Sequence, residues 1–158
     1  MQLSAPAKIN LTLDVLGRRA DGYHELCSIM QTVSLCDTVR VEAVRAAETA
    51  IAVKTDKGYL PADERNTAYK AAAAFLKAAG MTADIRIAIQ KRIPVGAGLG
   101  GGSADAAAVL RALDLLLHAG LTAEAMNQLA ASVGADVPFA LHGGCAVAEG
   151  IGDRLTHL

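Results

Sequence analysis

Hydrophobic and polar residues alternate over several short stretches, which is the pattern of β-strands. Residues 8–15 put Ile9, Leu11, Leu13 and Val15 on one face and Lys8, Asn10, Thr12 and Asp14 on the other. Pro6 has no N–H to donate, so we do not expect this strand to continue back through it as a central strand. Further strands are predicted near residues 33–35, 39–41, 51–53, 85–89 and 145–149, with Cys36 and Asp37 connecting the first two and 145–149 as the last strand.

Most of the remaining chain has the hydrophobic periodicity of α-helices. Asn66 to Ala79 predicts a helix closed by Gly80, and Thr122 is placed to cap a helix over residues 123–133. A third helix is expected from about Ala104 to His118, before Gly120. Its only polar stripe is Arg111, Asp114 and His118, so we expect it to be mostly buried. Strands and helices in this order predict an α+β domain.

Composition narrows the function classes. The chain has 158 residues, enough for one domain with a real core, and a net charge of −1 with no basic block, so nothing points to nucleic acid. No apolar run reaches membrane-spanning length, and the N-terminus lacks a signal-peptide pattern. Cys27, Cys36 and Cys145 show neither metal-site nor disulfide spacing. We therefore expect reduced thiols and a cytoplasmic location.

The most informative stretch is Pro94 to Asp105, which carries five glycines ahead of the long buried helix. Glycine lets backbone N–H groups approach a ligand, and a helix start adds unpaired N–H donors, so the stretch predicts a phosphate cradle. A side chain at Gly101 is expected to enter the phosphate space. Gly96, Gly98 and Gly101 satisfy G-x-G-x-x-G, but no βαβ unit follows, which disfavours a dinucleotide-dependent oxidoreductase. A Walker A loop would need Gly-Lys-Ser/Thr, which is absent here.

Four smaller clusters have both structural and functional interpretations. Lys8 with Asn10 is either a solvated strand face or a reactive pair, and residues 21–25 are either a surface turn or a pocket for a flat polar ligand. Asp136, between a glycine and a proline, is either a helix N-cap or a functional carboxylate. Gly143 and Gly144 suggest a plain turn.

Together these segments resemble the GHMP kinases, the superfamily of galactokinase, homoserine kinase and mevalonate kinase. The resemblance rests on residues 94–105, 5–11 (APAKINL), 19–26 (RADGYHEL) and 134–139 (GADVPF), and it covers essentially the whole chain. The Asp-Gly-Tyr-His stretch is similar to one branch, whose substrate is a cytidine diphosphate-linked methylerythritol on the non-mevalonate route to isoprenoids. The implied fold is the GHMP N-terminal domain (ribosomal protein S5 domain 2-like), a mixed sheet packed against helices.

The resemblance also implies roles for individual residues. Lys8 and Asp136 would form the catalytic pair, and Ser103 would lie near the ATP phosphates and Mg²⁺. Asn66 and Lys91 would lie near the adenosine, and Lys91 should point inward because it is in register with Ile85, Ile87 and Ile89. Asn10, Tyr23, His24 and Asp136 would contact the substrate. The loop residues implied in ATP binding are Pro94, Gly96, Gly98, Leu99, Gly100, Gly101, Gly102 and Ser103.

Members of the family have two domains, and residues 1–158 correspond to the first, ATP-binding domain. We expect the C-terminal GHMP domain to be absent from this chain, which would leave an apolar face open to self-association and would make phosphoryl transfer weak. The expected partner is a small molecule, with no nucleic acid or membrane. The alternative is a non-catalytic nucleotide- or metabolite-binding module on the same fold.

Overall fold

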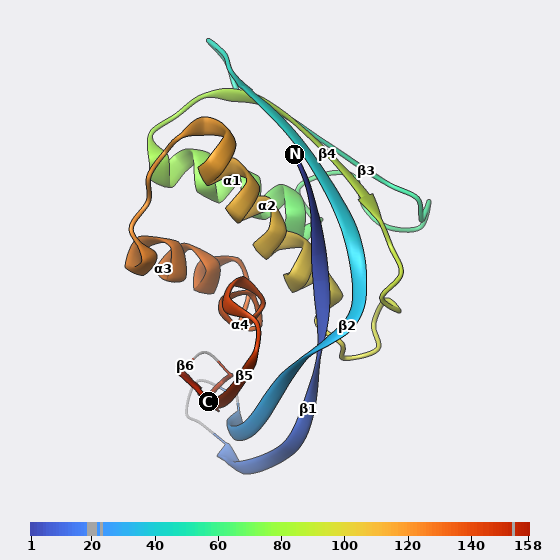
Figure 1. Cartoon of the computed structure of the whole chain (residues 1–158), viewed down its shortest axis with the longest axis vertical. Helices are drawn as coiled ribbons and strands as arrows, with labels where there is room; N and C mark the ends of the chain where they lie inside the picture. Colours follow the sequence, from blue (N-terminus) through green and yellow to red (C-terminus); the bar gives the residue numbers. More distant parts are fainter. Residues whose placement is uncertain (19–21, 23, 153) are drawn as a thin grey trace.

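The computed structural model describes residues 1–18, 22, 24–152 and 154–158. The strands are β1 (Gln2–Arg18), β2 (His24–Arg45), β3 (Ala50–Thr55), β4 (Ala83–Gln90), β5 (Cys145–Gly150) and β6 (Arg154–His157). The helices are α1 (Thr67–Ala79), α2 (Gly101–Leu117), α3 (Ala123–Val133) and α4 (Val137–His142). Figure 1 shows β1 to β4 as a curved sheet, with the helices gathered on its concave side. The predicted α+β architecture with a mixed sheet is confirmed.

β2 is the strand around which the sheet is built. Its residues 38–40 pair with both β1 and β4, and its residues 26–31 pair with both β1 and β5. A strand has two edges, so β4 and β5 share the edge of β2 that lies opposite β1. These pairings are antiparallel, and β3 adds a parallel partner to β4. The long β2 therefore joins two smaller groups of strands into one sheet.

The core lies between the sheet and α2. Ala106, Ala107 and Ala108 of α2 are fully buried, as are Val39 and Val41 of β2. The small alanine side chains let α2 lie close to both the sheet and α1. This close packing holds the start of α2, where the glycine loop ends, in a fixed place relative to β1 and β4.

Three expectations about the strands are wrong. The first strand is longer than the expected residues 8–15, because β1 begins at Gln2 and includes Pro6, which faces Cys36. Among the described strands β1 pairs with β2 alone, so it is an edge strand, and the expectation that Pro6 would not lie in a central strand holds. β2 is one strand rather than two, and it runs straight through Cys36 and Asp37. The strand at 145–149 is not the last, because β6 follows it; the short α4 was also not predicted.

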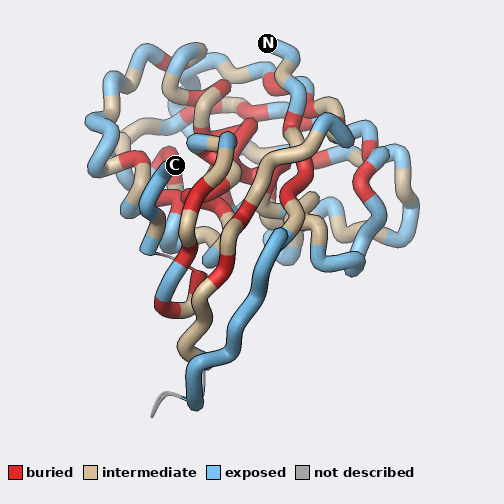
Figure 2. Tube along the Cα trace, turned by 60° about the horizontal axis from the view of Figure 1, so that its bottom comes forward, coloured by how far each residue is buried: buried red, intermediate tan, exposed pale blue. Residues whose placement is uncertain are grey.

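The second half of β1 is exposed on both faces. Leu11, Leu13 and Val15 keep 57%, 53% and 60% of their surface exposed, although their alternation predicted a half-buried strand. Here β1 and the start of β2 extend beyond the helices, and Figure 2 shows the exposed stretch leading away from the buried body. The self-association expected through an exposed apolar face stays a prediction.

The helix predictions are confirmed apart from one boundary. Asn66 caps α1 by accepting the N–H of Ala68 at 2.9 Å, and Gly80 closes that helix in the left-handed conformation. Thr122 caps α3 through the N–H of Ala125. α2 begins at Gly101 rather than near Ala104, so two glycines of the loop belong to its first turn.

Candidate functional site

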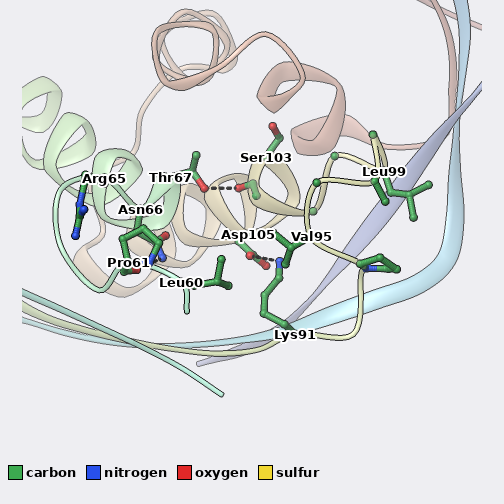
Figure 3. Close-up of a pocket in the computed structure, with 17 residues that line it drawn as sticks. Leu60, Pro61, Arg65, Asn66, Thr67, Lys91, Val95, Leu99, Ser103 and Asp105 are labelled. Atoms are coloured by element: carbon green, nitrogen blue, oxygen red, sulfur yellow. Dashed lines mark hydrogen bonds and ion pairs between the residues drawn. The ribbon is translucent and has the colours of Figure 1, made fainter. Parts of the chain in front are cut away.

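The glycine loop connects β4 to α2 and borders a pocket of about 360 Å³. Figure 3 shows how Leu60, Pro61 and Asn66 face the loop from the segment before α1, with Lys91 and Asp105 on the side of the sheet. The pocket is therefore lined by two segments that are separate in sequence, residues 60–67 and residues 91–105. The lining residues are Leu60, Pro61, Arg65, Asn66, Thr67, Lys91, Asp105 and all of residues 94–103.

Three loop glycines are required by backbone geometry. Gly96, Gly98 and Gly100 have φ of +76°, +75° and +68°, a region that side chains with a Cβ rarely adopt. Gly100 is the N-cap of α2, and no side chain caps this helix. The first backbone N–H groups of α2 have no partner within the helix. A 17-residue helix therefore presents the positive end of its dipole at the loop, as an anion site requires.

The expectation for Gly101 is wrong in its direction. A Cβ at Gly101 would lie 3.0 Å from Ile93 Cγ2 and 3.3 Å from Lys91 Nζ, so it would point into the protein and not into the phosphate space. A Cβ at Gly102 would lie 3.1 Å from Thr67 Oγ1. These two glycines let the helix start lie close to its neighbours.

Lys8 and Asp136 meet beside the loop. Lys8 Nζ lies 3.5 Å from Asp136 Oδ2 and donates to Asn10 Oδ1 at 3.2 Å. The side chain of Lys8 is 10% exposed and that of Asp136 is 31% exposed, so the pair is shielded but reachable. The backbone N–H of Lys8 donates to the carbonyl of Leu99 at 3.0 Å, which fixes β1 to the loop. The solvated-face interpretation of Lys8 is therefore wrong.

Asp136 is the residue before α4, but its side chain does not cap that helix. Its carboxylate faces Lys8 instead, which favours the functional interpretation over the N-cap. A Cβ at Gly100 would lie 3.0 Å from Lys8 Cγ and 3.8 Å from Asp136 Oδ2. Gly100 therefore touches both features of the site, because it caps α2 and leaves room for the charged pair.

Thr67 ties α1 to the start of α2, whereas the hydrogen bonds of Asn66 stay within its own segment. Asn66 Nδ2 donates to the carbonyl of Pro61 at 2.8 Å while its Oδ1 caps α1, so its polar atoms already serve the structure. Thr67 Oγ1 donates to the carbonyl of Gly102 at 2.8 Å. Thr67 had no signal in the sequence, because a threonine at the start of a helix is ordinary. The adenosine role of Asn66 stays a prediction.

Lys91 points inward, as its register predicted, but its partners are two buried aspartates. Lys91 Nζ lies 2.5 Å from Asp37 Oδ2 and 2.7 Å from Asp105 Oδ2. Burial raises the pKa of Asp105 to about 7, against the lowering effect of Lys91. Burial opposes the charge of Lys91, but the two carboxylates outweigh it and raise the pKa of Lys91. Neither aspartate was predicted, because its partners come from distant segments.

One predicted substrate residue, His24, is separate from this site. Tyr23 and Asp21 lie outside the described residues. His24 is exposed at the start of β2, where it borders a shallow hollow with Val15, Leu26 and Ile151. Val15 and Leu26 face each other near the end of the β1–β2 pair that extends beyond the helices, and Figure 1 shows the position of this end. The roles of Asn10, Ser103 and the other loop residues are not tested by this arrangement and stay predictions.

Comparison with known proteins decides the family. A family model described as the GHMP kinases N terminal domain matches residues 66–144, half of the chain, including α1, β4, the glycine loop and α2. The chain belongs to the GHMP kinase family. In this GHMP kinase domain, Lys8 and the whole of β1 and β2 lie outside the region that the family model matches.

Curated relatives point to one branch of the GHMP kinases. A 4-diphosphocytidyl-2-C-methyl-D-erythritol kinase of Caldicellulosiruptor saccharolyticus is 49% identical over 158 residues, covering 100% of this chain and 54% of the relative. The enzyme of the same name from Bacillus cereus strain B4264 is 47% identical over 156 residues, covering 99% and 53%. The chain spans about half the length of the curated relatives it matches.

Solved structures agree on the GHMP kinase fold. A crystal structure of 4-(cytidine 5'-diphospho)-2C-methyl-D-erythritol kinase is 46% identical and superposes with a TM-score of 0.83, covering 100% of this chain and 55% of the other. The mevalonate kinase of Methanococcus jannaschii has a TM-score of 0.73 at 15% identity, which supports the fold alone. Within the described residues, no helix is long and apolar enough to cross a membrane.

Proposed function

We propose that this domain binds ATP for transfer of its γ-phosphoryl group to the 2-hydroxyl of 4-diphosphocytidyl-2-C-methyl-D-erythritol. The main support for this proposal is that Lys8 Nζ and Asp136 Oδ2 lie 3.5 Å apart next to Gly100, at the start of α2. A cation, a carboxylate and an anion-binding helix start at one point supply the positioning and charge neutralisation that phosphoryl transfer needs. The identity of the substrate is inferred from the names of the relatives.

In this proposal Asp136 accepts the proton of the 2-hydroxyl as the oxygen attacks phosphorus. The new bond joins that oxygen to the γ-phosphorus, the bond from the γ-phosphorus to the β,γ-bridging oxygen breaks, and ADP leaves. Lys8 stabilises the negative charge that develops on the attacking oxygen. Asn10, which accepts a hydrogen bond from Lys8, orients the lysine or the substrate.

Phosphates would be held by the backbone N–H groups of residues 96–103 and by the dipole of α2. Among the described residues, no group of three or more His, Cys, Asp or Glu side chains gathers to hold a metal ion. A Mg²⁺ that is bound together with ATP needs few protein ligands, because it takes most of its ligands from phosphates and water. Ser103 is the protein ligand proposed for it, and the ion would neutralise phosphate charge.

Calorimetry with ATP and with adenosine tests the binding half of this proposal. The chain is expected to bind ATP more tightly than adenosine, because the loop recognises phosphate. A phosphate-transfer assay with 4-diphosphocytidyl-2-C-methyl-D-erythritol and labelled ATP tests the chemical half. Binding with no transfer under any condition would favour the non-catalytic nucleotide- or metabolite-binding alternative, and absence of ATP binding would contradict the proposed function.

A further inference from the structure

A cluster of three charged side chains lies buried beneath the glycine loop. Lys91 follows β4, Asp37 belongs to β2 and Asp105 belongs to α2, and their side chains are 4%, 0% and 5% exposed. Charged groups are rarely buried to this extent unless they are paired. The proposed chemistry at Lys8 and Asp136 uses none of the three.

The hydrogen bonds of this triad hold both ends of the loop. Asp37 Oδ1 accepts the backbone N–H groups of Arg92 at 2.5 Å and Ile93 at 2.8 Å, which fixes the chain as it enters the loop. Asp37 Oδ2 and Asp105 Oδ2 share the ammonium of Lys91. Because Asp105 is in the second turn of α2, the same ammonium fixes the chain as it leaves the loop.

The triad also touches the helix start directly. A Cβ at Gly101 would lie 3.3 Å from Lys91 Nζ, so the first turn of α2 rests against the lysine side chain. In Figure 3 the Lys91 side chain reaches from below the loop to Asp105. Movement of Lys91 would therefore shift the backbone at the start of α2.

We propose that Lys91, Asp37 and Asp105 act as a clamp that holds the phosphate loop in its binding geometry. This inference rests on the proposed phosphate-binding role of the loop. In it, Lys91 and Asp105 are positioning residues for the nucleotide phosphates, and Lys91 is held by the carboxylates rather than released to the ligand.

Electrostatics alone makes the opposite prediction, which gives a sharp test. The triad has one cation and two carboxylates, so its ionised form adds net negative charge beneath a site for a polyanion. If charge alone mattered, removal of the Asp105 carboxylate would strengthen phosphate binding. If the clamp matters, the same removal weakens it, because the helix start loses its tie to Lys91.

The experiment measures the binding of ADP and adenosine to the chain by calorimetry at pH 8, where Asp105 is mostly ionised. Asp105→Asn keeps an oxygen acceptor for Lys91 but loses the charge-assisted bond, so ADP binding should weaken about fivefold. Asp105→Ala loses the acceptor, and ADP binding should weaken about thirtyfold. Adenosine binding should change less than about twofold in both, since it makes no use of the phosphate loop.

Asp84→Ala is the matched control, because Asp84 pairs with Arg86 at 3.4 Å on the exposed side of β4. It should leave ADP binding unchanged. Equal or tighter ADP binding by Asp105→Asn than by the unmodified chain would overturn the clamp while leaving the proposed function intact. Should Asp105→Ala fail to fold, the direction of the Asp105→Asn change alone decides. Failure of the unmodified chain to bind ADP would instead overturn the proposed function.

Discussion

Lys8 and Asp136 carry the proposed chemistry, so their removal should slow phosphoryl transfer without abolishing nucleotide binding. Asp136→Asn keeps the size of the side chain but cannot accept the hydroxyl proton, and the rate should fall by about 10²–10⁴-fold. Lys8→Met should also slow transfer, because it removes the cation that stabilises the attacking oxygen. Single-turnover transfer from labelled ATP measures the rate, and calorimetry measures ATP binding. A rate within threefold of the unmodified chain would contradict the proposed roles.

Gly→Ala variants at Gly100 and Gly98 test whether Gly100 leaves space for the Lys8 side chain. Both have positive φ, so Gly→Ala at either position introduces backbone strain of about 1–3 kcal/mol. Only at Gly100 does the new Cβ crowd Lys8 Cγ, at 3.0 Å, whereas nothing lies within 4 Å of a Cβ at Gly98. Both variants should lose similar thermal stability, but Gly100→Ala should lose more transfer rate. Equal rates in the two variants would show that Gly100 does not make room for Lys8.

Asp105 predicts a specific dependence of stability on pH. Burial raises its pKa from 3.8 to about 7 in the folded chain, where Lys91 and Asp37 are the charged groups facing it. Between these two values the native state binds more protons than the unfolded state, so the contribution of Asp105 to the free energy of unfolding falls as pH rises. Asp105→Asn does not titrate. Its stability relative to the unmodified chain should therefore increase between about pH 5 and about pH 8, as measured by urea unfolding.

At the scale of elements, α2 depends on small side chains. Ala107 is fully buried within it, so Ala107→Leu should force the helix away from its neighbours and lower the free energy of unfolding by about 1–3 kcal/mol. Ala73→Leu on α1 is the matched control, because Ala73 is exposed and the same atoms are added in solvent. Denaturant unfolding compares the two. Equal stabilities would mean that the packing around α2 is looser than its burial indicates.

The local pattern predicted the elements that depend on local interactions. Asn66, Gly80 and Thr122 act through backbone groups within a few residues, so α1 and α3 were predicted with their caps. β2 was divided in two because an aspartate in the middle of a strand resembles a turn. In the fold, Asp37 is satisfied by N–H groups about 55 residues away in sequence. Contacts at that separation leave no trace in the local alternation of residues.

The same limit applies to the site. The glycine density and the resemblance predicted the loop, Lys8 and Asp136. They did not predict Asp37, Asp105 or Thr67, whose significance comes only from the partners that the fold brings to them. Leu11, Leu13 and Val15 were predicted to share one face of a half-buried strand, but all three are exposed, and the pairing of β1 with β2 is irregular between Asn10 and Thr12. The sequence of one strand does not show what packs against its side chains, and in this chain these three are exposed to solvent.

For the molecule as a whole, we predict that this 158-residue chain binds ATP but transfers its phosphoryl group poorly. The described residues include the glycine loop, α2 and the Lys8–Asp136 pair. The groups proposed to bind the phosphates are therefore all present in this chain. The hydroxyl substrate must also be held in line with the γ-phosphorus. Among the described residues, the end of the β1–β2 pair where His24 lies has a shallow, exposed hollow.

Loss of well-oriented positioning can remove roughly 7–11 kcal/mol of barrier lowering, which exceeds what the catalytic pair contributes through proton transfer. The measurement is transfer from labelled ATP to 4-diphosphocytidyl-2-C-methyl-D-erythritol by the chain alone, beside calorimetric ATP binding. The Asp136→Asn variant gives the background rate. Turnover of about 1 s⁻¹ or more, within the ordinary range of kinases, would show that these residues alone hold both reactants in line. In that case the exposed face of β1 would be the surface that binds the hydroxyl substrate.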